Sequence, residues 1–551
     1  MSSPARTGPG PRHPGTQLDP GVASYQWRWA SAWSGVGLIL TAWCAWVLWH
    51  PPALGHFTDS VEYLILSEFF RGALGGDAPV QAADYFGHSR FPPLFPLALA
   101  VVGASPSSPV GGLLLTQVLA VLGSALFVAW YLRQGLGVTR SAILGLAAFA
   151  CPAWLYMLMT QVSEPLLVLL IGAVLLRTSH RARTPAALTA LACIVGLAPI
   201  ARLAGGALVL TFGAWLIRER EIAPWRRVLL FLVAAFPGTA WIAYRSLLPI
   251  EESYLEALNM QRVLQAFGGW SGLLRQPLAL VEALAAAFTP FPRLLQHLIA
   301  FLLLALAAVS LRQRLRRNDL DAWFTPIYIG LVLVWPYPAE ATRLLLVLLP
   351  ILLLQASTAF DTWRPQGHVY GALRPAGFLV AAMALFACFS GWWHTWHRAQ
   401  VVMDPELEPQ RRSMAYFGAE TDDQAQFGAE ILARVIALSE ELPAVVPPGD
   451  CVYTLYPAMA WVYSRRAVQV RIIPREVIDG RVPPDSLRDC RFLLVANLHV
   501  LQYDVPALFP LEGLRGRLRP VLHSTFEFRG NLVPAAYLFV WNDLDPQGVA
   551  P

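Results

Sequence analysis

Residues 29–49 read WASAWSGVGLILTAWCAWVLW, a stretch without a single charged side chain. A helix of about 20 apolar residues is long enough to cross the hydrocarbon core of a bilayer. Further apolar stretches follow at residues 109–131, 141–158, 165–176, 186–200, 204–217, 228–244, 294–311, 322–335, 343–358 and 373–393. The sequence therefore predicts an α-helical polytopic membrane protein with about eleven transmembrane helices.

The composition of the whole chain agrees with this prediction. Of its 551 residues, 56% are hydrophobic and 14% are charged, and a water-soluble core cannot bury so large an apolar fraction. The sequence contains no lysine, so all 41 residues counted as Lys or Arg are arginine. This excludes the usual phosphate-loop and kinase mechanisms and pyridoxal phosphate chemistry, which need a lysine. A bias toward arginine codons is the simplest origin of the pattern.

The arginines also predict an orientation, because cytoplasmic loops retain positive charge. If the N-terminus is cytoplasmic, the inner connections hold Arg133, Arg140, Arg177, Arg181, Arg183, Arg218, Arg220, Arg226, Arg227, Arg312, Arg314, Arg316, Arg317, Arg364 and Arg374. An odd number of spans then places everything after about residue 394 outside. We expect a multi-pass protein of the inner (cytoplasmic) membrane, surrounded by its lipids, with residues 1–28 as a disordered cytoplasmic tail.

Three outer segments differ in character. Residues 50–108 and 246–292 are expected to form outer loops, and residues 394–551 have the composition of a soluble domain. Helical periodicity at 427–442 and short β-prone runs at 451–455, 468–473, 491–496 and 536–541 predict an extracytoplasmic α/β domain. Cys451 and Cys490 each open a predicted strand, so they either pair in the oxidising outer compartment or remain free thiols.

The first outer loop carries several residues suited to chemistry. Asp59, Glu62 and Tyr63 come soon after the first span, and His88 and Arg90 follow later in the loop. Asp59 and Tyr63 would share one face of a helix. A carboxylate at the boundary between lipid and water can accept the proton of a hydroxyl or amine nucleophile. A solvated acid without a function is the alternative interpretation from position alone.

A resemblance to a known family favours the functional interpretation. An Asp with a Tyr four residues later, just outside the first span, and the run FPPLFP at residues 91–96 resemble the membrane glycosyltransferases of the GT-C fold. Among these, the likeness is strongest to bacterial relatives of the protein mannosyltransferases and to the lipid A aminoarabinose transferases. Glu164, at an outer turn between two spans, resembles the second acidic position of this family.

Two arginine segments extend the resemblance along the chain. Arg202 with Gly205 and Gly206, and Arg343 with the apolar run that ends at Pro350, are similar to recurrent arginine motifs of these enzymes. The resemblance thus implies a GT-C-like transmembrane module over residues 29–393.

The resemblance implies a glycosyltransferase of hexosyl or pentosyl type that uses a polyprenyl-phosphate sugar on the outer face of the membrane. Nucleotide sugars are not available there, so the activated donor must be anchored in lipid. Asp59 is expected to act as general base in an inverting displacement, and Glu164 to orient sugar or acceptor hydroxyls. The acceptor would be a lipid, a glycan or a protein, and the sequence names neither acceptor nor sugar.

The lipid phosphate would be held by Arg90, Arg202 and Arg343, near a third carboxylate, Glu340. Arginine forks suit phosphate oxygens, although an arginine at a helix end is also a common interfacial anchor. Tyr63, Glu62 and His88 are further candidates for substrate binding. The sequence departs from the aminoarabinose transferases at Ser60, where they carry a second acid, and in having no lysine to assist the phosphate.

Beyond the lipid-linked sugar we expect no cofactor, no divalent metal and no nucleic-acid partner. The main alternative is a secondary transporter or lipid-carrier flippase. Such a protein would be expected to show an internal repeat and charged or broken helices at the membrane midplane, and the sequence shows neither clearly.

Overall fold

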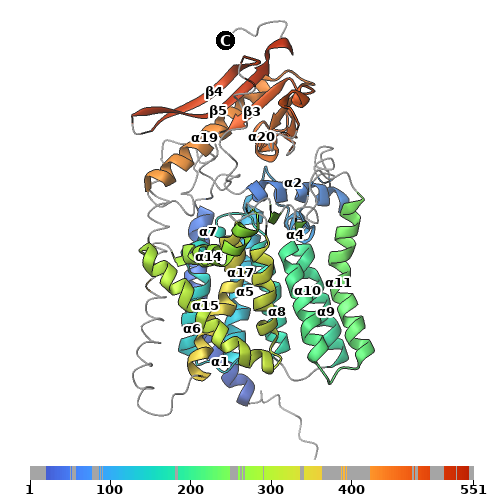
Figure 1. The fold of residues 1–551 in the computed structure, drawn as a ribbon, viewed down its shortest axis with the longest axis vertical. Coiled ribbons are helices and arrows are strands. Elements are labelled where there is room, and N and C mark those ends of the chain that lie inside the picture. Colours follow the sequence, from blue (N-terminus) through green and yellow to red (C-terminus); the bar gives the residue numbers. More distant parts are fainter. Residues whose placement is uncertain are drawn as a thin grey trace, which may run out of the picture.

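The structure is a computed structural model. It describes residues 20–49, 58–76, 91–179, 184–247, 269–288, 291–335, 340–362, 422–474, 482–496, 516–528 and 530–544, and isolated positions between these ranges. Within the described residues, a bundle of roughly parallel and antiparallel helices lies below a domain built on a β-sheet (Figure 1).

Helices overlap each of the first ten predicted spans. They are α1 (Pro20–Trp49), α5 (Val110–Arg133), α6 (Val138–Phe149), α8 (Glu164–Thr178), α9 (Pro185–Ala201), α10 (Gly206–Arg218), α11 (Pro224–Ser246), α15 (Arg293–Arg316), α16 (Leu320–Leu333) and α17 (Ala341–Thr362). Five of them, α1, α5, α11, α15 and α17, are long and apolar enough to cross a membrane, and others are shorter. The eleventh predicted span, 373–393, lies almost entirely outside the described residues, so the count of eleven stays a prediction.

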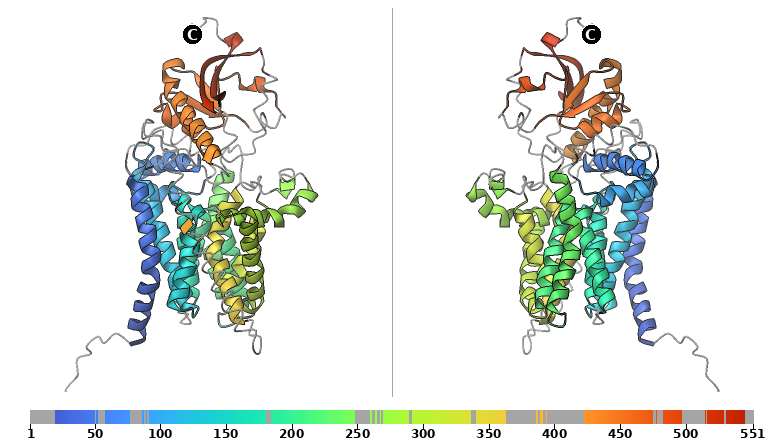
Figure 2. Two further views of the ribbon diagram at one scale, coloured as in Figure 1. Left: turned by 90° about the vertical axis from the view of Figure 1, so that its left-hand side faces the viewer. Right: turned by 90° about the vertical axis from the view of Figure 1, so that its right-hand side faces the viewer.

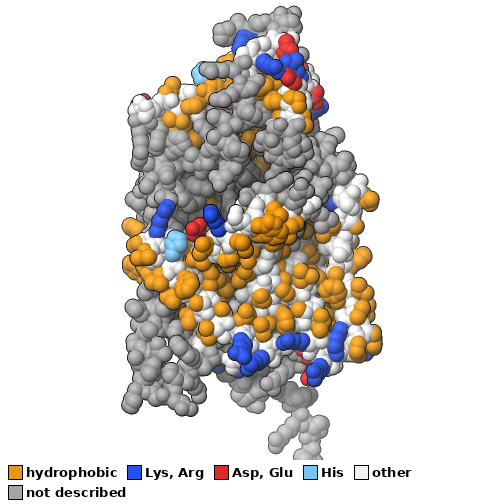
Figure 3. All heavy atoms as spheres, in the orientation of Figure 1, with side chains coloured by type: hydrophobic (Ala, Val, Ile, Leu, Met, Phe, Trp, Pro, Cys, Tyr) orange, Lys and Arg blue, Asp and Glu red, His pale blue; other side chains and the backbone are white. Residues whose placement is uncertain are grey.

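The outside of the bundle is apolar at its waist and basic at one end. Phe236 on α11 and Phe301 on α15 are 69% and 60% exposed, as expected for side chains that face lipid rather than water. In Figure 3, orange hydrophobic side chains cover the bundle and blue basic side chains gather near its lower end. This charge asymmetry agrees with the predicted orientation, which itself stays a prediction.

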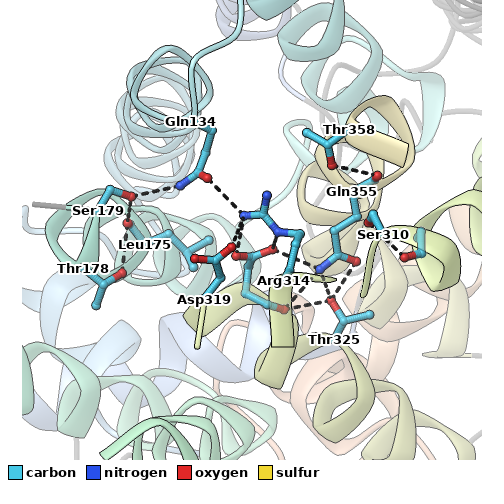
Figure 4. A network of polar contacts seen from close by, with 12 residues as sticks. Gln134, Leu175, Thr178, Ser179, Ser310, Arg314, Asp319, Thr325, Gln355 and Thr358 are labelled. Carbon is cyan, nitrogen blue, oxygen red and sulfur yellow. Dashed lines mark hydrogen bonds and ion pairs between the residues drawn. The ribbon is translucent and has the colours of Figure 1, made fainter. Parts of the chain in front are cut away.

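A buried polar network joins four segments at the basic end (Figure 4). Arg314 of α15 donates from Nε and Nη2 to the two carboxylate oxygens of Asp321 of α16, both at 2.8 Å. Arg314 also donates to Gln134, after α5, at 3.2 Å. Gln355 of α17 donates to Asp321 Oδ2 at 3.1 Å and to Thr325 at 2.9 Å. Buried charges are tolerated only when paired in this way.

The two segments that the sequence predicts as outer loops contain helices. The first contains α2 (Thr58–Ala73) and α4 (Leu94–Val101), and the second contains α14 (Trp270–Ala285) followed by a short 3₁₀ turn (Ala286–Phe288). A six-residue helix, α7 (Pro152–Met157), precedes α8 on the same side. Helix α2 lies crosswise over the end of the bundle, directly beneath the sheet domain in both views of Figure 2.

The C-terminal domain, called the outer domain after its predicted location, combines helices α19 (Asp422–Val445) and α20 (Pro457–Tyr463) with a five-stranded mixed sheet of order β2-β1-β3-β5-β4. The strands are β1 (Cys451–Thr454), β2 (Gln469–Ile472), β3 (Phe492–Ala496), β4 (Leu518–Phe528) and β5 (Asn531–Trp541). Strand β1 pairs in parallel with β2 and β3, whereas β5 pairs antiparallel with β3 and β4. Cys451 and Cys490 form a disulfide, which settles the alternative left open by the sequence.

Candidate active site

Glu164 is the centre of the site. It occupies the first turn of α8, next to Pro165, and its side chain is fully buried. A helix N-terminus favours negative charge, but a buried carboxylate also needs direct partners. Two arginines from other helices supply them.

Arg202 and Arg343 both bind the Glu164 carboxylate. Arg202 lies at the end of α9, and its Nη1 is 2.9 Å from Glu164 Oε1. Arg343 lies in the first turn of α17 and donates from Nε to Glu164 Oε1 and from Nη2 to Oε2. The three residues are separated along the chain, so only the packing of α8, α9 and α17 brings them together.

Arg343 also reaches Asp59, the predicted base. Its Nη2 lies 2.7 Å from Asp59 Oδ2. Asp59 is in the first turn of α2 and is largely buried. One guanidinium therefore joins the two carboxylates that the sequence placed in the site, which is the bidentate use that distinguishes arginine from lysine.

Glu340 adds a third carboxylate at the edge of the cluster. Its Oε2 is 4.0 Å from Arg202 Nη2 and accepts a hydrogen bond from the indole Nε1 of Trp335 at 3.0 Å. The side chain of Glu340 is 18% exposed, against 0% for Glu164. The cluster thus grows more accessible from Glu164 toward Glu340.

Tyr63 closes the cluster on the α2 side. Its hydroxyl is 3.0 Å from Ser163 Oγ, which also accepts from Arg202 Nη1 at 3.3 Å. Burial, and next the nearby Asp59 carboxylate, raise the pKa of Tyr63 far above its usual value. The phenol is therefore protonated at any working pH and acts as a neutral hydrogen-bonding group.

Gly205 explains how Arg202 reaches the cluster. Arg202 leaves the helix with an extended backbone (φ −156°, ψ 136°), and a 3₁₀ turn at Leu203–Gly205 leads into α10. A Cβ on Gly205 would lie 2.2 Å from the carbonyl oxygen of Ala198, whereas a Cβ on Gly206 would meet nothing within 4 Å. Only glycine at 205 lets the turn fold back onto α9.

Five of the predicted site residues converge: Asp59, Tyr63, Glu164, Arg202 and Arg343, with Glu340 beside them. Glu62 lies on α2 next to Tyr63 and is partly exposed. His88 and Arg90 lie outside the described residues, so their predicted roles stay predictions. Ser163 is a site residue that no motif in the sequence indicated by itself, although its position directly before Glu164 is a usable signal.

The charge balance of the cluster is the main addition to the predicted site. Three carboxylates face two guanidinium groups, so Arg202 and Arg343 already have anionic partners. A phosphate could bind them only in competition with Asp59, Glu164 and Glu340. Among the described residues, no group of three or more His, Cys, Asp or Glu side chains converges as metal ligands would, and these carboxylates contact arginine instead.

Comparison with solved structures identifies the fold. No protein-family model matches the chain, and no curated protein sequence matches it. An oligosaccharyltransferase of Archaeoglobus fulgidus, solved in complex with Zn and sulfate, has a TM-score of 0.50 and 12% identity over 91% of this chain and 73% of that one. ArnT from Cupriavidus metallidurans, solved bound to undecaprenyl phosphate, is similar over 93% of this chain and 98% of that one, with 14% identity and a TM-score of 0.46.

A mycobacterial arabinofuranosyltransferase, AftD, is also similar, over 91% of this chain and 41% of that one, with 15% identity and a TM-score of 0.42. The likeness to the oligosaccharyltransferase shows that this chain has the GT-C glycosyltransferase fold that the sequence motifs predicted.

Proposed function

We propose that the protein is a membrane glycosyltransferase that moves a sugar from a polyprenyl-phosphate donor to a lipid, glycan or protein acceptor at the outer face of the membrane. The observation that carries the proposal is the pairing of Asp59 and Glu164 through Arg343, at the end of a GT-C bundle that lies beneath the sheet domain. Buried ionisable groups at the end of a membrane bundle are costly, which favours a functional role.

Asp59 is the proposed general base. It would take the proton of the acceptor hydroxyl or amine while the acceptor atom forms a bond to the anomeric carbon. The bond from the anomeric carbon to the phosphate oxygen breaks with its electron pair, and polyprenyl phosphate leaves. A single displacement of this kind inverts the anomeric centre. Glu164, held by two arginines, would fix the positions of Arg202 and Arg343 and orient sugar hydroxyls.

The donor phosphate would compete with the carboxylates for Arg343. An ion pair with a guanidinium weakens a carboxylate as a base, because it stabilises the ionised form. When Arg343 turns to the phosphate, Asp59 loses this partner and becomes a stronger base. Donor binding would thereby activate the base, and Arg343 would offset the charge that develops on the leaving phosphate. Arg90 and Arg202 are the further proposed phosphate ligands.

The proposed reaction uses the lipid-linked sugar as its only co-substrate and no divalent metal. Its support is the pairing of Asp59, Glu164 and Glu340 with guanidinium groups, which already hold the carboxylates that would otherwise bind a cation. Transfer that is unchanged in EDTA would support this part, and transfer that is lost in EDTA and restored by a divalent cation would contradict it.

The test is transfer from radiolabelled polyprenyl-phosphate sugars in membranes that contain the wild-type protein or Asp59→Asn. Loss of a general base costs about 10²–10⁴ in rate, so Asp59→Asn should reduce transfer at least a hundredfold with unchanged protein abundance. Glu282→Gln is the control, because it neutralises an exposed carboxylate on α14 that is not one of the carboxylates of the cluster. Unchanged transfer in Asp59→Asn would remove Asp59 from the base role.

A further inference from the structure

Helix α2 is held between the bundle and the outer domain. Tyr63 and Leu64 belong to the hydrophobic core of the bundle. Val61 and Ile65 belong instead to the core of the outer domain, with Ile431 of α19 among their companions. The helix that carries Asp59 is therefore a shared wall between the two parts of the molecule, as its position in Figure 2 shows.

A buried ion pair fixes this arrangement. Glu68 is 1% exposed, and its Oε1 accepts a charge-assisted hydrogen bond from Nη2 of Arg466, almost four hundred residues later in the chain. Arg71, one turn along α2, is more distant at 3.9 Å and more exposed. A buried carboxylate is stable only with such a partner, so Arg466 ties the outer domain to α2.

The outer domain holds Arg466 in a defined position. Helix α20 ends in a turn in which Arg465 and Arg466 both have positive φ, at 53° and 63°. The backbone N–H of Arg466 donates to the carbonyl of Trp461 at 2.9 Å, and its guanidinium lies over the Trp461 ring, 5.0 Å from the centroid. A helix end built in this way presents the guanidinium to Glu68.

We infer that the outer domain positions the base: Arg466, through Glu68, fixes the place of α2 and thereby the alignment of Asp59 with Arg343. This inference rests on the proposed function of Asp59. Glu68 and Asp59 lie on one continuous helix, about 14 Å apart along its axis, so a tilt of α2 at Glu68 moves Asp59. Glu68 and Arg466 are positioning residues and contact neither reacting group.

The test uses Arg466→Met, with Arg466→Lys as the conservative variant and Arg465→Met as the matched control. The arginine, lysine and methionine side chains are all unbranched at Cβ, so the positive φ at residues 465 and 466 is equally strained in each variant and in wild type. Displacement of a catalytic group by about 1 Å can cost a hundredfold. In purified full-length protein we expect kcat to fall 10- to 100-fold in Arg466→Met, with KM for the donor within about threefold of wild type.

Arg466→Lys should recover most of kcat, and Arg465→Met should match wild type. Glu68→Gln combined with Arg466→Met should be no worse than Arg466→Met alone, because both changes break one pair. Unchanged kcat in Arg466→Met, or an equal loss in Arg465→Met, would overturn the inference.

A second measurement separates this inference from the proposed function. Amide hydrogen exchange over residues 58–73 reports the order of α2 without any substrate. Exchange should increase at least tenfold in Arg466→Met and not in Arg465→Met. If wild-type protein transfers no sugar but α2 responds in this way, the proposed function fails while the coupling of α2 to the outer domain stands. If exchange is the same in both variants and in wild type, the coupling fails.

Discussion

Nη2 of Arg343 lies 2.7 Å from Asp59 Oδ2, while Nε of the same guanidinium binds Glu164. Arg343 thus connects the first turns of α2 and α8 from the first turn of α17. Both carboxylates are therefore bound to one cation, so displacement of either one would also disturb the other. A substitution of Arg343 should therefore affect the proposed base, the proposed phosphate site and the packing of the three helices together.

Arg343→Lys should therefore behave as a severe change. A lysine ammonium is a point charge and cannot bridge two carboxylates in the geometry of a guanidinium fork. We expect kcat/KM for sugar transfer to fall about a hundredfold, measured with saturating acceptor. Arg293→Lys, at the exposed N-terminal end of α15, is the control and should leave transfer unchanged. Equal activities in the two variants would contradict the bridging role.

The sequence predicts the bundle well because its signals are local. Apolar length places the spans, and each of the first ten overlaps a helix in the structure. Strand β4 was not predicted, because Pro520 and the polar residues around it break the apolar pattern. Its place depends on pairing with β5, with one register shift between Pro520 and Leu522 and another between Ser524 and Thr525. Such pairing is not encoded in the strand alone.

In the candidate site, too, individual residues could be predicted from local sequence, but their contacts could not. Asp59 and Arg343 could be named from motifs, but their pairing depends on how α2 and α17 pack. The pairing of three carboxylates with two arginines could not be predicted either. The sequence indicated arginines that suit a phosphate, but it did not show that carboxylates already bind them. The contact between Glu68 and Arg466 joins residues far apart in the chain, and no periodic or local signal points to it.

Gly205→Ala should impair the protein and Gly206→Ala should not. The new Cβ at 205 would overlap the carbonyl oxygen of Ala198, a backbone atom that cannot move without displacing α9, whereas the Cβ at 206 has open space. We expect Gly205→Ala to lower transfer at least tenfold through a displaced Arg202 and to lower the apparent Tm in detergent. An unaffected Gly205→Ala variant would show that the 3₁₀ turn can rearrange.

Tyr63→Phe should lower activity without changing its pH dependence. Burial raises the pKa of Tyr63, so the phenol keeps its proton and its hydrogen bond below that pKa. This contribution to activity would disappear only at strongly alkaline pH. Removing one hydrogen bond, worth about 1 kcal/mol, should reduce kcat/KM roughly fivefold at every pH between about 5 and 9. An alkaline limb of the profile that vanishes in Tyr63→Phe would instead assign that limb to Tyr63. Tyr244→Phe, at the exposed end of α11, is the control.

Asp321→Ala should destabilise the bundle from its basic end. Among the described residues, removing this carboxylate leaves the buried Arg314 guanidinium with Gln134 and the more distant Asp319, 3.7 Å away, as its side-chain partners. Breaking a buried pair in this way costs about 3–5 kcal/mol, so the apparent Tm of the detergent-solubilised protein should fall by several degrees. Asp485→Ala, which removes exposed ion pairs with Arg488 and Arg517, should leave the Tm unchanged.

Adding Arg314→Ala to Asp321→Ala should lower the Tm little further or restore part of the loss, because the buried guanidinium that lost its partner is then removed as well. If the double variant is destabilised by the full sum of the two single changes, Arg314 and Asp321 act independently and the network shown in Figure 4 does not hold the helices together.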